Sequence, residues 1–183
     1  MLVQRSMDLS NAKLEFFVGS INLFAIIGAL LSSRITEVYG FRGSFIVAAV
    51  GFIVGILIMI FSTNFSSLMF GRIFVGLGVG FGMTIGPIYL SEISPKSHRG
   101  YFVSWAEIGC NIGILLGFAT GLLSYAIEPN LAWRVMYAIG CIMPLMLIVL
   151  SMLVMSESPR WLVQKGKDSE ALSILRKIYP VGK

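Results

Sequence analysis

The sequence predicts an all-α membrane protein, and three observations support that prediction. Of its 183 residues, 56% are hydrophobic and only 13% are charged, whereas a soluble domain carries about 25% charged residues. The mean hydropathy is +0.86. Five apolar runs follow one another along the chain, each close to the ~20 residues that a helix needs to cross a hydrocarbon core of ~30 Å. We therefore expect a bundle of five transmembrane helices followed by an amphipathic helical segment.

Short polar gaps separate the five runs. The runs cover residues 14–33, 43–61, 65–90, 101–127 and 133–155. The basic N-terminal tail leads directly into a full-length run, whereas a signal peptide has a short apolar core and a cleavage site. The expected organisation is a short non-cytoplasmic tail over 1–13, a five-helix transmembrane bundle over 14–156 and a cytoplasmic helical segment over 157–183.

The positions of lysine and arginine predict the orientation. Alternate gaps and the C-terminal segment hold most of them, namely Arg34, Arg42, Lys96, Arg99, Arg160, Lys165, Lys167, Arg176, Lys177 and Lys183. The opposite side receives only Arg5, Lys13 and Arg134. Since basic residues favour the cytoplasmic side of a membrane protein, we expect the C-terminus inside and the N-terminus outside. In the last segment leucines alternate with charges, which is typical of amphipathic helices that lie along a membrane.

The glycine-rich stretch GRIFVGLGVGFGMTIGPIYLSE admits two interpretations. A dinucleotide-binding loop needs G-x-G-x-x-G, but a match that starts at Gly76 meets Phe81 at its last position, and no G-K-[ST] follows. As a helix, the stretch places glycines four residues apart on one face. The same spacing recurs in other runs, giving the sets Gly78, Gly82, Gly86; Gly109, Gly113, Gly117, Gly121; and Gly51, Gly55. Small residues at this spacing let helices approach closely in lipid, so we predict packing faces.

Other function classes find little support in the sequence. No nucleophile–base pair, metal-ligand cluster or complete nucleotide motif is present, so neither an enzyme nor a cofactor or metal site is expected. The net charge of +5 does not reflect a basic patch between aromatic residues, which argues against nucleic-acid binding. Cys110 and Cys141 lie inside apolar runs and are expected to be small buried hydrophobes. Pro87 and Pro144 lie inside runs as well, and they predict helix kinks.

Two charges lie inside the predicted spans. Arg72 is about two turns from the outer end of its helix, and Glu107 is about two turns from the inner end of the next. Each costs roughly 2.5–3.5 kcal/mol on insertion scales. Arg72 either reaches the outer interface with its long side chain or faces a polar cavity. Glu107 is either a protonated carboxyl bonded to a neighbouring helix or part of a polar path that Asn111, one turn later, extends.

Four motifs, GRIFVG, PIYLSEISPKSHRG, GILLG and SESPRWLV, resemble those of the sugar-porter branch of the major facilitator superfamily. The segment SWAEIGCNIGILLGF is most similar to the plant polyol and monosaccharide proton symporters. The resemblance covers the second to the sixth helix of the family and its first cytoplasmic helices. It implies a partial N-terminal helix bundle of the superfamily and transport of a polyol or monosaccharide by proton symport with alternating access.

The resemblance also implies roles for particular residues. Glu107 matches a position that hydrogen-bonds substrate hydroxyls, with Asn111 and Ile114 as further expected substrate contacts. Arg72 matches an arginine that pairs with an acidic residue of the family's first helix in proton-coupled members. A cytoplasmic ion-pair network that closes the outward-open state is expected at Arg34, Glu37, Arg42, Glu92, Arg99, Glu157 and Arg160. The alternative is that these charges only solvate the loops, because exposed pairs contribute about 0–1 kcal/mol.

The sequence also departs from the family pattern. In SRITEVYGFRG, the usual aspartate is Glu37, the first glycine is Ser33 and one arginine is Phe41; Ser156 stands where proline is usual. No counterpart of the first helix or of a second half is seen. Two hypotheses therefore stay open: a carrier of a sugar or polyol and a proton in the lipid bilayer, completed by a C-terminal half, or a truncated, non-transporting membrane protein that associates with intact carriers. The plasma membrane is the expected location.

Overall fold

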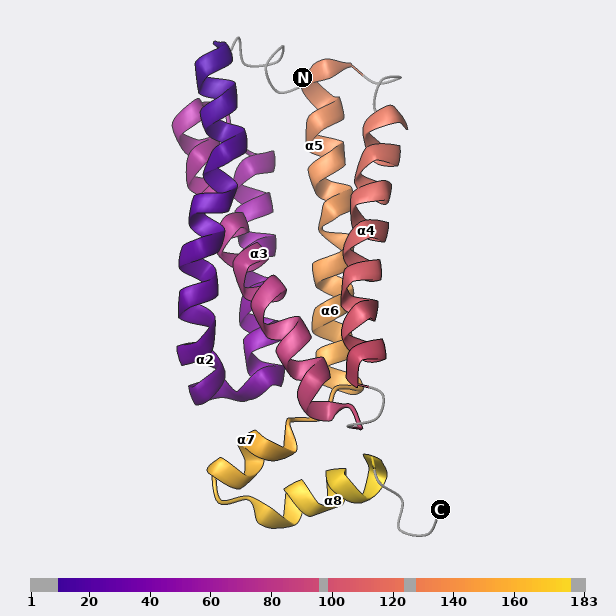
Figure 1. Ribbon diagram of the computed structural model, residues 1–183. Coiled ribbons are helices and arrows are strands. Elements are labelled where there is room, and N and C mark those ends of the chain that lie inside the picture. The colour runs from indigo at the N-terminus through magenta and orange to yellow at the C-terminus, as the bar shows by residue number, and fades with distance from the viewer. Residues whose placement is uncertain (1–9, 96–98, 124–127, 179–183) are drawn as a thin grey trace.

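The computed structural model describes residues 10–95, 99–123 and 128–178, and these residues form helices joined by short connections, with no strand among them (Figure 1). An upright bundle contains α2 (Asn11–Ile60), α3 (Phe65–Ile93), α4 (Arg99–Leu123), α5 (Pro129–Gly140) and α6 (Ile142–Leu153). Two short helices, α7 (Pro159–Gln164) and α8 (Asp168–Ile178), lie below the bundle. The prediction of an all-helical protein is confirmed.

Helix α2 is bent back on itself at Gly40. This residue has φ 75° and ψ 178°, so it interrupts the helical backbone and divides α2 into a first arm, 11–39, and a second arm, 41–60. A positive φ of this size is strained for residues with a side chain and open to glycine. The arms run in opposite directions and turn at the end of the bundle next to α7, here called the lower end (Figure 1). They correspond to the first two predicted runs.

Length and hydropathy make the bundle helices able to cross a membrane. Four helical stretches satisfy both criteria: Asn11–Ile60, Phe65–Ile93, Gly100–Leu122 and Leu131–Leu153. Because the first of these four stretches doubles back at Gly40 and contributes two passes, the described part of the chain passes through the bundle five times. The protein is therefore an integral membrane protein, as the sequence predicts. The predicted fourth run extends over 124–127, which lie outside the described residues.

The last predicted run, 133–155, forms two helices rather than one. Helix α5 ends at Gly140 and α6 begins at Ile142, with Cys141 between them. Pro144 has no N–H to donate to the carbonyl of Gly140, and its ring crowds that carbonyl. The N–H of Cys141 donates to the carbonyl of Ala138, three residues earlier, at 3.1 Å, whereas a regular α-helix pairs each N–H with the carbonyl four residues earlier. The helical hydrogen bonding is therefore interrupted just before the proline of this run, and the kink that this proline predicts stays a prediction.

Glycines bring α2 and α3 into backbone contact. A Cβ on Gly55 would lie 2.8 Å from the carbonyl oxygen of Gly71, and a Cβ on Gly80 would clash with the carbonyl of Ala25. Gly28 approaches the carbonyl of Leu77 in the same way. Close approach of this kind favours helix association in lipid through van der Waals contact. Part of the predicted glycine packing is thus present.

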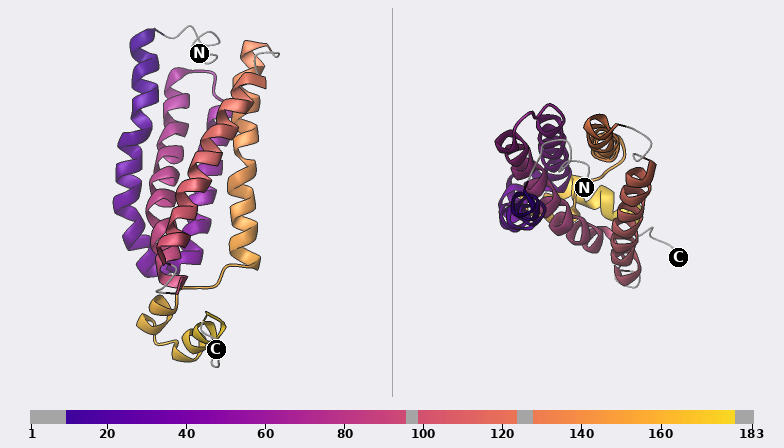
Figure 2. Two further views of the ribbon diagram at one scale, coloured as in Figure 1. Left: turned by 45° about the vertical axis from the view of Figure 1, so that its right-hand side comes forward. Right: turned by 90° about the horizontal axis from the view of Figure 1, so that it is seen from above.

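On the other predicted glycine faces, a Cβ on Gly78 would meet Cβ of Phe52 at 3.1 Å, and the remaining glycines make no close backbone contact. A Cβ added to any of five of these glycines would meet nothing within 4 Å among the described residues; these are Gly82, Gly86, Gly109, Gly113 and Gly117. Gly51 is equally open, and Gly121 would reach only the methyl of Met136, at 3.6 Å. These glycines therefore lie on open faces among the described residues, and their use in packing stays a prediction. Those of α4 belong to a helix that stands at the edge of the bundle (Figure 2).

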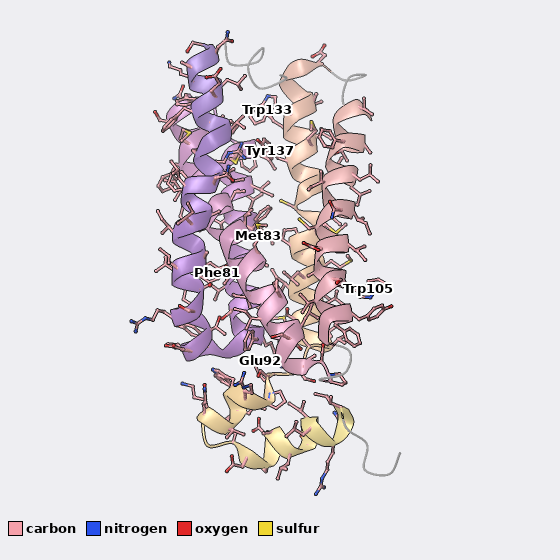
Figure 3. The ribbon with its side chains drawn as sticks, viewed as in Figure 1. Phe81, Met83, Glu92, Trp105, Trp133 and Tyr137 are labelled. Atoms are coloured by element: carbon pink, nitrogen blue, oxygen red, sulfur yellow. The ribbon has the colours of Figure 1, made fainter. Side chains whose placement is uncertain are left out.

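The far end of the bundle, here called the upper end, is closed by α5. Trp133 is 2% exposed and packs into a core cluster with Phe17, Met59 and Leu68. Trp133 and Tyr137 point from α5 toward α2 and α3, whereas Trp105 lies on the outer side of α4 (Figure 3). A second cluster, formed by Phe41, Phe45, Ala48, Phe81 and Ile85, fills the space near the lower end. These two clusters hold the helices of the bundle together and so position the polar residues described below.

Candidate functional site

A carboxylate closes the bend of α2 at the lower end. Glu157 follows α6, and its Oε2 and Oε1 accept hydrogen bonds from the backbone N–H groups of Phe41 (3.0 Å) and Arg42 (2.9 Å). These N–H groups begin the second arm, where a helix has no carbonyl partners of its own and carries a partial positive charge. Glu157 therefore caps a helix that lies more than a hundred residues earlier in the chain.

Arg42 makes the reciprocal contact. Its Nη2 donates to the carbonyl oxygen of Met152 at 2.6 Å, and Met152 lies in the last turn of α6, where carbonyls lack helical donors. The negative end of α6 thus meets a cation, and the positive end of the second arm meets an anion. Both contacts are charge-assisted, which makes them stronger than neutral hydrogen bonds. Together they join α2 to the α6–α7 connection.

Helix α7 is tied to α3 and to the first arm. Ser158, at the start of α7, donates its hydroxyl to Oε2 of Glu92 on α3. Arg160 places Nη1 3.8 Å from Oε1 of the same carboxylate, although its side chain is 76% exposed. The indole N–H of Trp161 donates to the carbonyl oxygen of Glu37 at 3.1 Å. Tyr89 adds a hydrogen bond of 2.8 Å from its hydroxyl to the carbonyl of Ser156.

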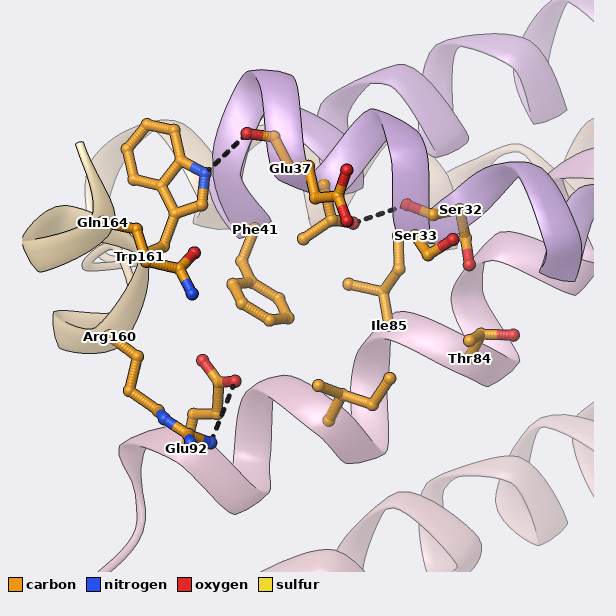
Figure 4. Close-up of a pocket in the computed structure, with 12 residues that line it drawn as sticks. Ser32, Ser33, Glu37, Phe41, Thr84, Ile85, Glu92, Arg160, Trp161 and Gln164 are labelled. Carbon is orange, nitrogen blue, oxygen red and sulfur yellow. Dashed lines mark hydrogen bonds and ion pairs between the residues drawn. The ribbon is translucent and has the colours of Figure 1, made fainter.

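These contacts surround a pocket of about 330 Å³ between the first arm, α3 and α7 (Figure 4). Hydroxyl, carboxylate and aromatic side chains share its wall. Its lining residues are Ser32, Ser33, Thr36, Glu37, Phe41, Thr84, Ile85, Ile88, Glu92, Arg160, Trp161 and Gln164. The close-up shows Arg160 and Glu92 paired on one side of the pocket and Trp161 bonded to Glu37 on the other (Figure 4). We call the charged and polar groups around this pocket and the Gly40 bend the lower-end cluster.

The structure gathers some of the predicted gate residues and separates others. Glu37, Arg42, Glu92, Glu157 and Arg160 all take part in the lower-end cluster. Among them the described residues contain one ion pair, between Glu92 and Arg160; the remaining contacts use backbone groups. Arg34 is exposed and forms no ion pair with any described residue. The side chain of Arg99, like Lys96, lies outside the described part of the chain.

The predicted substrate residues share one open face of α4. Glu107, Asn111 and Ile114 are all exposed, and their spacing puts them on one side of the helix. The amide of Asn111 donates to the backbone carbonyl of Glu107 at 2.9 Å. Within the described residues the carboxylate of Glu107 has no ion-pair partner. A face that carries a carboxylate inside a membrane-length helix must meet water, a polar ligand or another polar chain.

Arg72 is held by an aromatic ring. Its guanidinium carbon lies 3.9 Å from the centroid of Phe17, which comes from the first arm. Its Nε is buried and has no hydrogen-bond acceptor among the described residues. Tyr137 of α5 packs against the core cluster to which Phe17 belongs. The Arg72 side chain is thus half-buried with its Nε inside the bundle, and both interpretations given for it from the sequence stay predictions.

Several residues of these sites are not predicted by sequence reasoning. Ser158 and Trp161 belong to the recognised motif SESPRWLV, which is a signal that could have identified them. Tyr89 lies in PIYLSEISPKSHRG and carries the same kind of signal. Phe17 has none, because a phenylalanine in an apolar run is normally a core residue. Its role depends on which residue of another helix faces it.

Comparisons with known proteins agree on one family. A family model described as "Sugar (and other) transporter" matches residues 2–182. "Polyol transporter 5" of Arabidopsis thaliana is 34% identical over 175 residues, which are 96% of this chain and 32% of that protein. "H(+)/hexose cotransporter 1" of Parachlorella kessleri is 35% identical over 92% of this chain and 31% of its own length. The chain thus spans about a third of the length of the curated relatives it matches.

Solved structures give the same picture. The proton:xylose symporter XylE bound to 6-bromo-6-deoxy-D-glucose superimposes with a TM-score of 0.89 and 28% sequence identity, over 97% of this chain and 44% of that one. The inward-open conformation of the xylose transporter XylE from E. coli superimposes with a TM-score of 0.83, also at 28% identity. Both are described as transporters of the sugar xylose.

Proposed function

The chain belongs to the sugar transporter family, and we propose that it takes part in proton-coupled transport of a polyol or monosaccharide by alternating access. Relatives named as polyol transporters and as a proton/hexose cotransporter support the substrate class and the coupling. The likeness to a proton:xylose symporter supports the same reaction. In this proposal the substrate binds against α4, while the lower-end cluster opens and closes the path to the cytoplasm.

The observation that carries the proposal is the polar face of α4. Glu107 lies inside a helix that is long and apolar enough to span a membrane, and its carboxylate is exposed. A charged group at this depth is expensive unless it faces a partner or a water-filled cavity, so it marks a functional site. A carboxylate accepts several hydrogen bonds at once, which suits a ligand made of hydroxyl groups. Asn111 and Ile114 would extend this contact.

The lower-end cluster supplies a gate in this proposal. Its contacts join α7 and the connection that precedes it to both arms of α2 and to α3. A contact that exists in one state and breaks in another shifts the equilibrium by its own free energy. The charge-assisted bonds of Glu157 and the pair of Glu92 with Arg160 are of this kind. We place this end of the bundle on the cytoplasmic side, in line with the basic residues around it.

Arg72 is the proposed coupling cation. The resemblance to proton-coupled members assigns it an acidic partner on a further helix, and its buried Nε supports a role as a donor to such a group. In that arrangement the carboxylate would bind either Arg72 or a proton, and this exchange links proton movement to the change of state.

The proposal also includes the location of the protein, which is the plasma membrane rather than an internal membrane. Fluorescence imaging of a tagged protein tests this location.

Uptake measurements test the substrate site. The protein is expressed from its own complete reading frame in cells that lack polyol and hexose uptake, and uptake of labelled polyols and monosaccharides is followed with and without a proton gradient. Glu107→Gln and Glu107→Ala should each lower uptake about tenfold or more, since hydrogen bonds to a charged group contribute roughly 1.5–3 kcal/mol. Glu170→Gln, at an exposed position of α8, is the matched control. Wild-type uptake in both Glu107 variants would remove α4 from the substrate site.

A thiol already in the chain reports on the gate. Contrary to the expectation that it is buried, Cys110 is exposed on α4, within one turn of Glu107. If the lower-end cluster closes the cytoplasmic side, Glu157→Gln should speed the labelling of Cys110 by a membrane-impermeant maleimide added to inside-out vesicles. The measurement is made in a Cys141→Ser background, and labelling is quantified by mass spectrometry on the peptide that contains Cys110. Unchanged labelling in Glu157→Gln would mean that the cluster stabilises the fold without gating the path.

A second candidate function rests on the same helix. In the part of α4 that could span the membrane, none of the residues is buried within the chain, which favours association of this face with an intact carrier. A non-transporting partner of this kind would co-purify with a full-length family member and would show no uptake by itself. Co-purification should then weaken when Gly113 and Gly117 are both changed to leucine. Recovery of the chain alone from membranes that contain such a carrier would count against association.

A further inference from the structure

The cation of Arg72 lies against the face of an aromatic ring. The distance of 3.9 Å between the guanidinium carbon and the centroid of Phe17 is well inside the ~6 Å within which cation–π attraction acts. Phe17 is 3% exposed, so the contact is shielded from water. Desolvated contacts of this kind are stronger than exposed ones. The ring comes from the first arm of α2 and the cation from α3.

No carboxylate neutralises Arg72 among the described residues. The two ion pairs of the described chain involve other residues, and both lie at the lower end. The phenol of Tyr137, on α5, packs against the core cluster that contains Phe17. Tyr137 in turn packs edge-on against Trp133, with ring centroids 6.1 Å apart. Phe17, Tyr137 and Trp133 therefore surround the upper end of α3 with aromatic groups, and the Nε of Arg72 keeps its hydrogen for an acceptor.

We propose that Phe17 is a positioning residue for Arg72: its ring face fixes the guanidinium inside the bundle, in a pose that leaves the Nε–H group available to an oxygen acceptor. The negative face of the ring attracts the guanidinium as a whole, but the ring offers no oxygen that could accept a hydrogen bond from the Nε–H group. A carboxylate at the same place would occupy the donors of Arg72. The proposal rests on the proposed function only for the part that Arg72 plays in transport; the contact itself is a property of this chain.

Simple packing is the competing explanation, and it makes a different prediction. If Phe17 only fills space, leucine should replace it with little effect on Arg72, since both are large apolar residues. If the ring face holds the cation, leucine should release the guanidinium while tyrosine keeps it. Phe16 precedes Phe17 in α2 but is 59% exposed. Phe16→Leu is therefore the matched control for the loss of a phenylalanine from this helix.

Chemical modification of arginine measures the contact directly. The full chain, in wild-type, Phe17→Leu, Phe17→Tyr and Phe16→Leu forms, is reconstituted in lipid nanodiscs and treated with phenylglyoxal, and the peptide that contains Arg72 is quantified by mass spectrometry. Arg34, which is exposed, serves as the internal reference. Phe17→Leu should raise the rate at Arg72 roughly 5- to 30-fold, the range that corresponds to a desolvated cation–π contact. Phe17→Tyr and Phe16→Leu should react like the wild type.

A fluorinated ring keeps the test valid if Phe17→Leu does not fold. Fluorine withdraws electron density from the ring face while its shape is nearly kept, so site-specific mono-, di- and trifluorophenylalanine at position 17 should raise the rate at Arg72 in steps. Equal rates across this series, or across wild type and a folded Phe17→Leu, would overturn the proposal.

Uptake separates this result from the proposed function. If the Arg72 rates follow the prediction and the wild type shows no proton-dependent uptake, the positioning of Arg72 stands and the transport proposal fails. If proton-dependent uptake is found while the Arg72 rates stay unchanged, the transport proposal stands and the positioning role of Phe17 fails.

Discussion

The carboxylate of Glu157 occupies the space into which a side chain on Gly40 would project. A Cβ at Gly40 would lie 2.7 Å from Oε2 of Glu157 and 2.8 Å from its carboxyl carbon. The same carboxylate caps the second arm through the N–H groups of Phe41 and Arg42. Gly40 is thus required twice, once for its φ of 75° and once to admit the cap.

Gly40→Ala is therefore expected to be strongly destabilising. A left-handed backbone with a side chain costs roughly 1–2 kcal/mol, and displacement of the cap adds about 0.5–2 kcal/mol. The free energy of unfolding in detergent micelles, measured by denaturant titration, should fall by the sum of the two. Gly51→Ala is the control: it lies in the second arm with nothing within 4 Å of its Cβ position, so it should change stability by no more than about 1 kcal/mol, in the stabilising direction. Equal effects of the two variants would contradict this account of the bend.

Glu157→Gln should weaken the cap without removing it. The amide retains one acceptor oxygen, but its NH₂ group cannot accept from the second backbone donor. We expect a loss of about 1–2 kcal/mol of unfolding free energy. Glu128→Gln is the matched comparison, because Glu128 precedes α5 but makes no side-chain capping bond; it should stay within about 0.5 kcal/mol of the wild type. A larger loss in Glu128→Gln than in Glu157→Gln would be inconsistent with the capping geometry.

Two partners of Glu92 should contribute very unequally. Ser158 is fully buried and donates its hydroxyl to Glu92, so Ser158→Ala leaves an oxygen of the partly buried Glu92 carboxylate without this donor and should cost about 1–3 kcal/mol. Arg160 is mostly exposed and lies 3.8 Å from the same carboxylate. Arg160→Ala should cost at most about 1 kcal/mol, and less at high salt. Thermal unfolding of both variants at low and high salt distinguishes the contributions, and the reverse order would show that the ion pair dominates.

Two glycines of α3 provide a packing test within one helix. Gly80→Ala forces a methyl group against the carbonyl of Ala25 and should destabilise the protein by about 1–3 kcal/mol. Gly82 lies two residues after Gly80, and a Cβ added there meets nothing within 4 Å. Gly82→Ala should therefore be neutral or stabilising by up to about 1 kcal/mol. Denaturant midpoints of the two variants decide the matter. Similar losses in both would mean that Gly82 packs against a surface outside the described residues.

The spans could be predicted because hydropathy and length are local properties. The ends of the helices could not be, since charged residues such as Arg34 and Glu37 are compatible with a helix that continues past the apolar run. The gap between the first two runs therefore contains helix up to a one-residue bend at Gly40. A glycine that follows a run of helix formers is a known termination signal, so the bend itself had a signal. The cap by Glu157 did not, because it joins residues 115 and 116 positions apart.

The glycine faces show a different limit. In α3 the pair Gly76 and Gly80 and the set that begins at Gly78 have the same spacing. The first pair contacts the first arm of α2, and in the second set only Gly78 has a near neighbour. Spacing identifies a smooth face but does not say which face meets a helix. For the same reason the sequence predicts Arg72 as a special residue but not Phe17 as its neighbour.

The single-residue bend also constrains how the protein is made. We expect two arms joined by one residue to enter a bilayer together, as a helical hairpin. The free energy that drives its insertion is then the sum over both arms, so a less hydrophobic arm can insert because the more hydrophobic arm inserts with it. Arg34 and Arg42 flank the bend, and because basic residues favour the cytoplasmic side, we expect them to hold the bend on the side of synthesis and to set the direction of the hairpin.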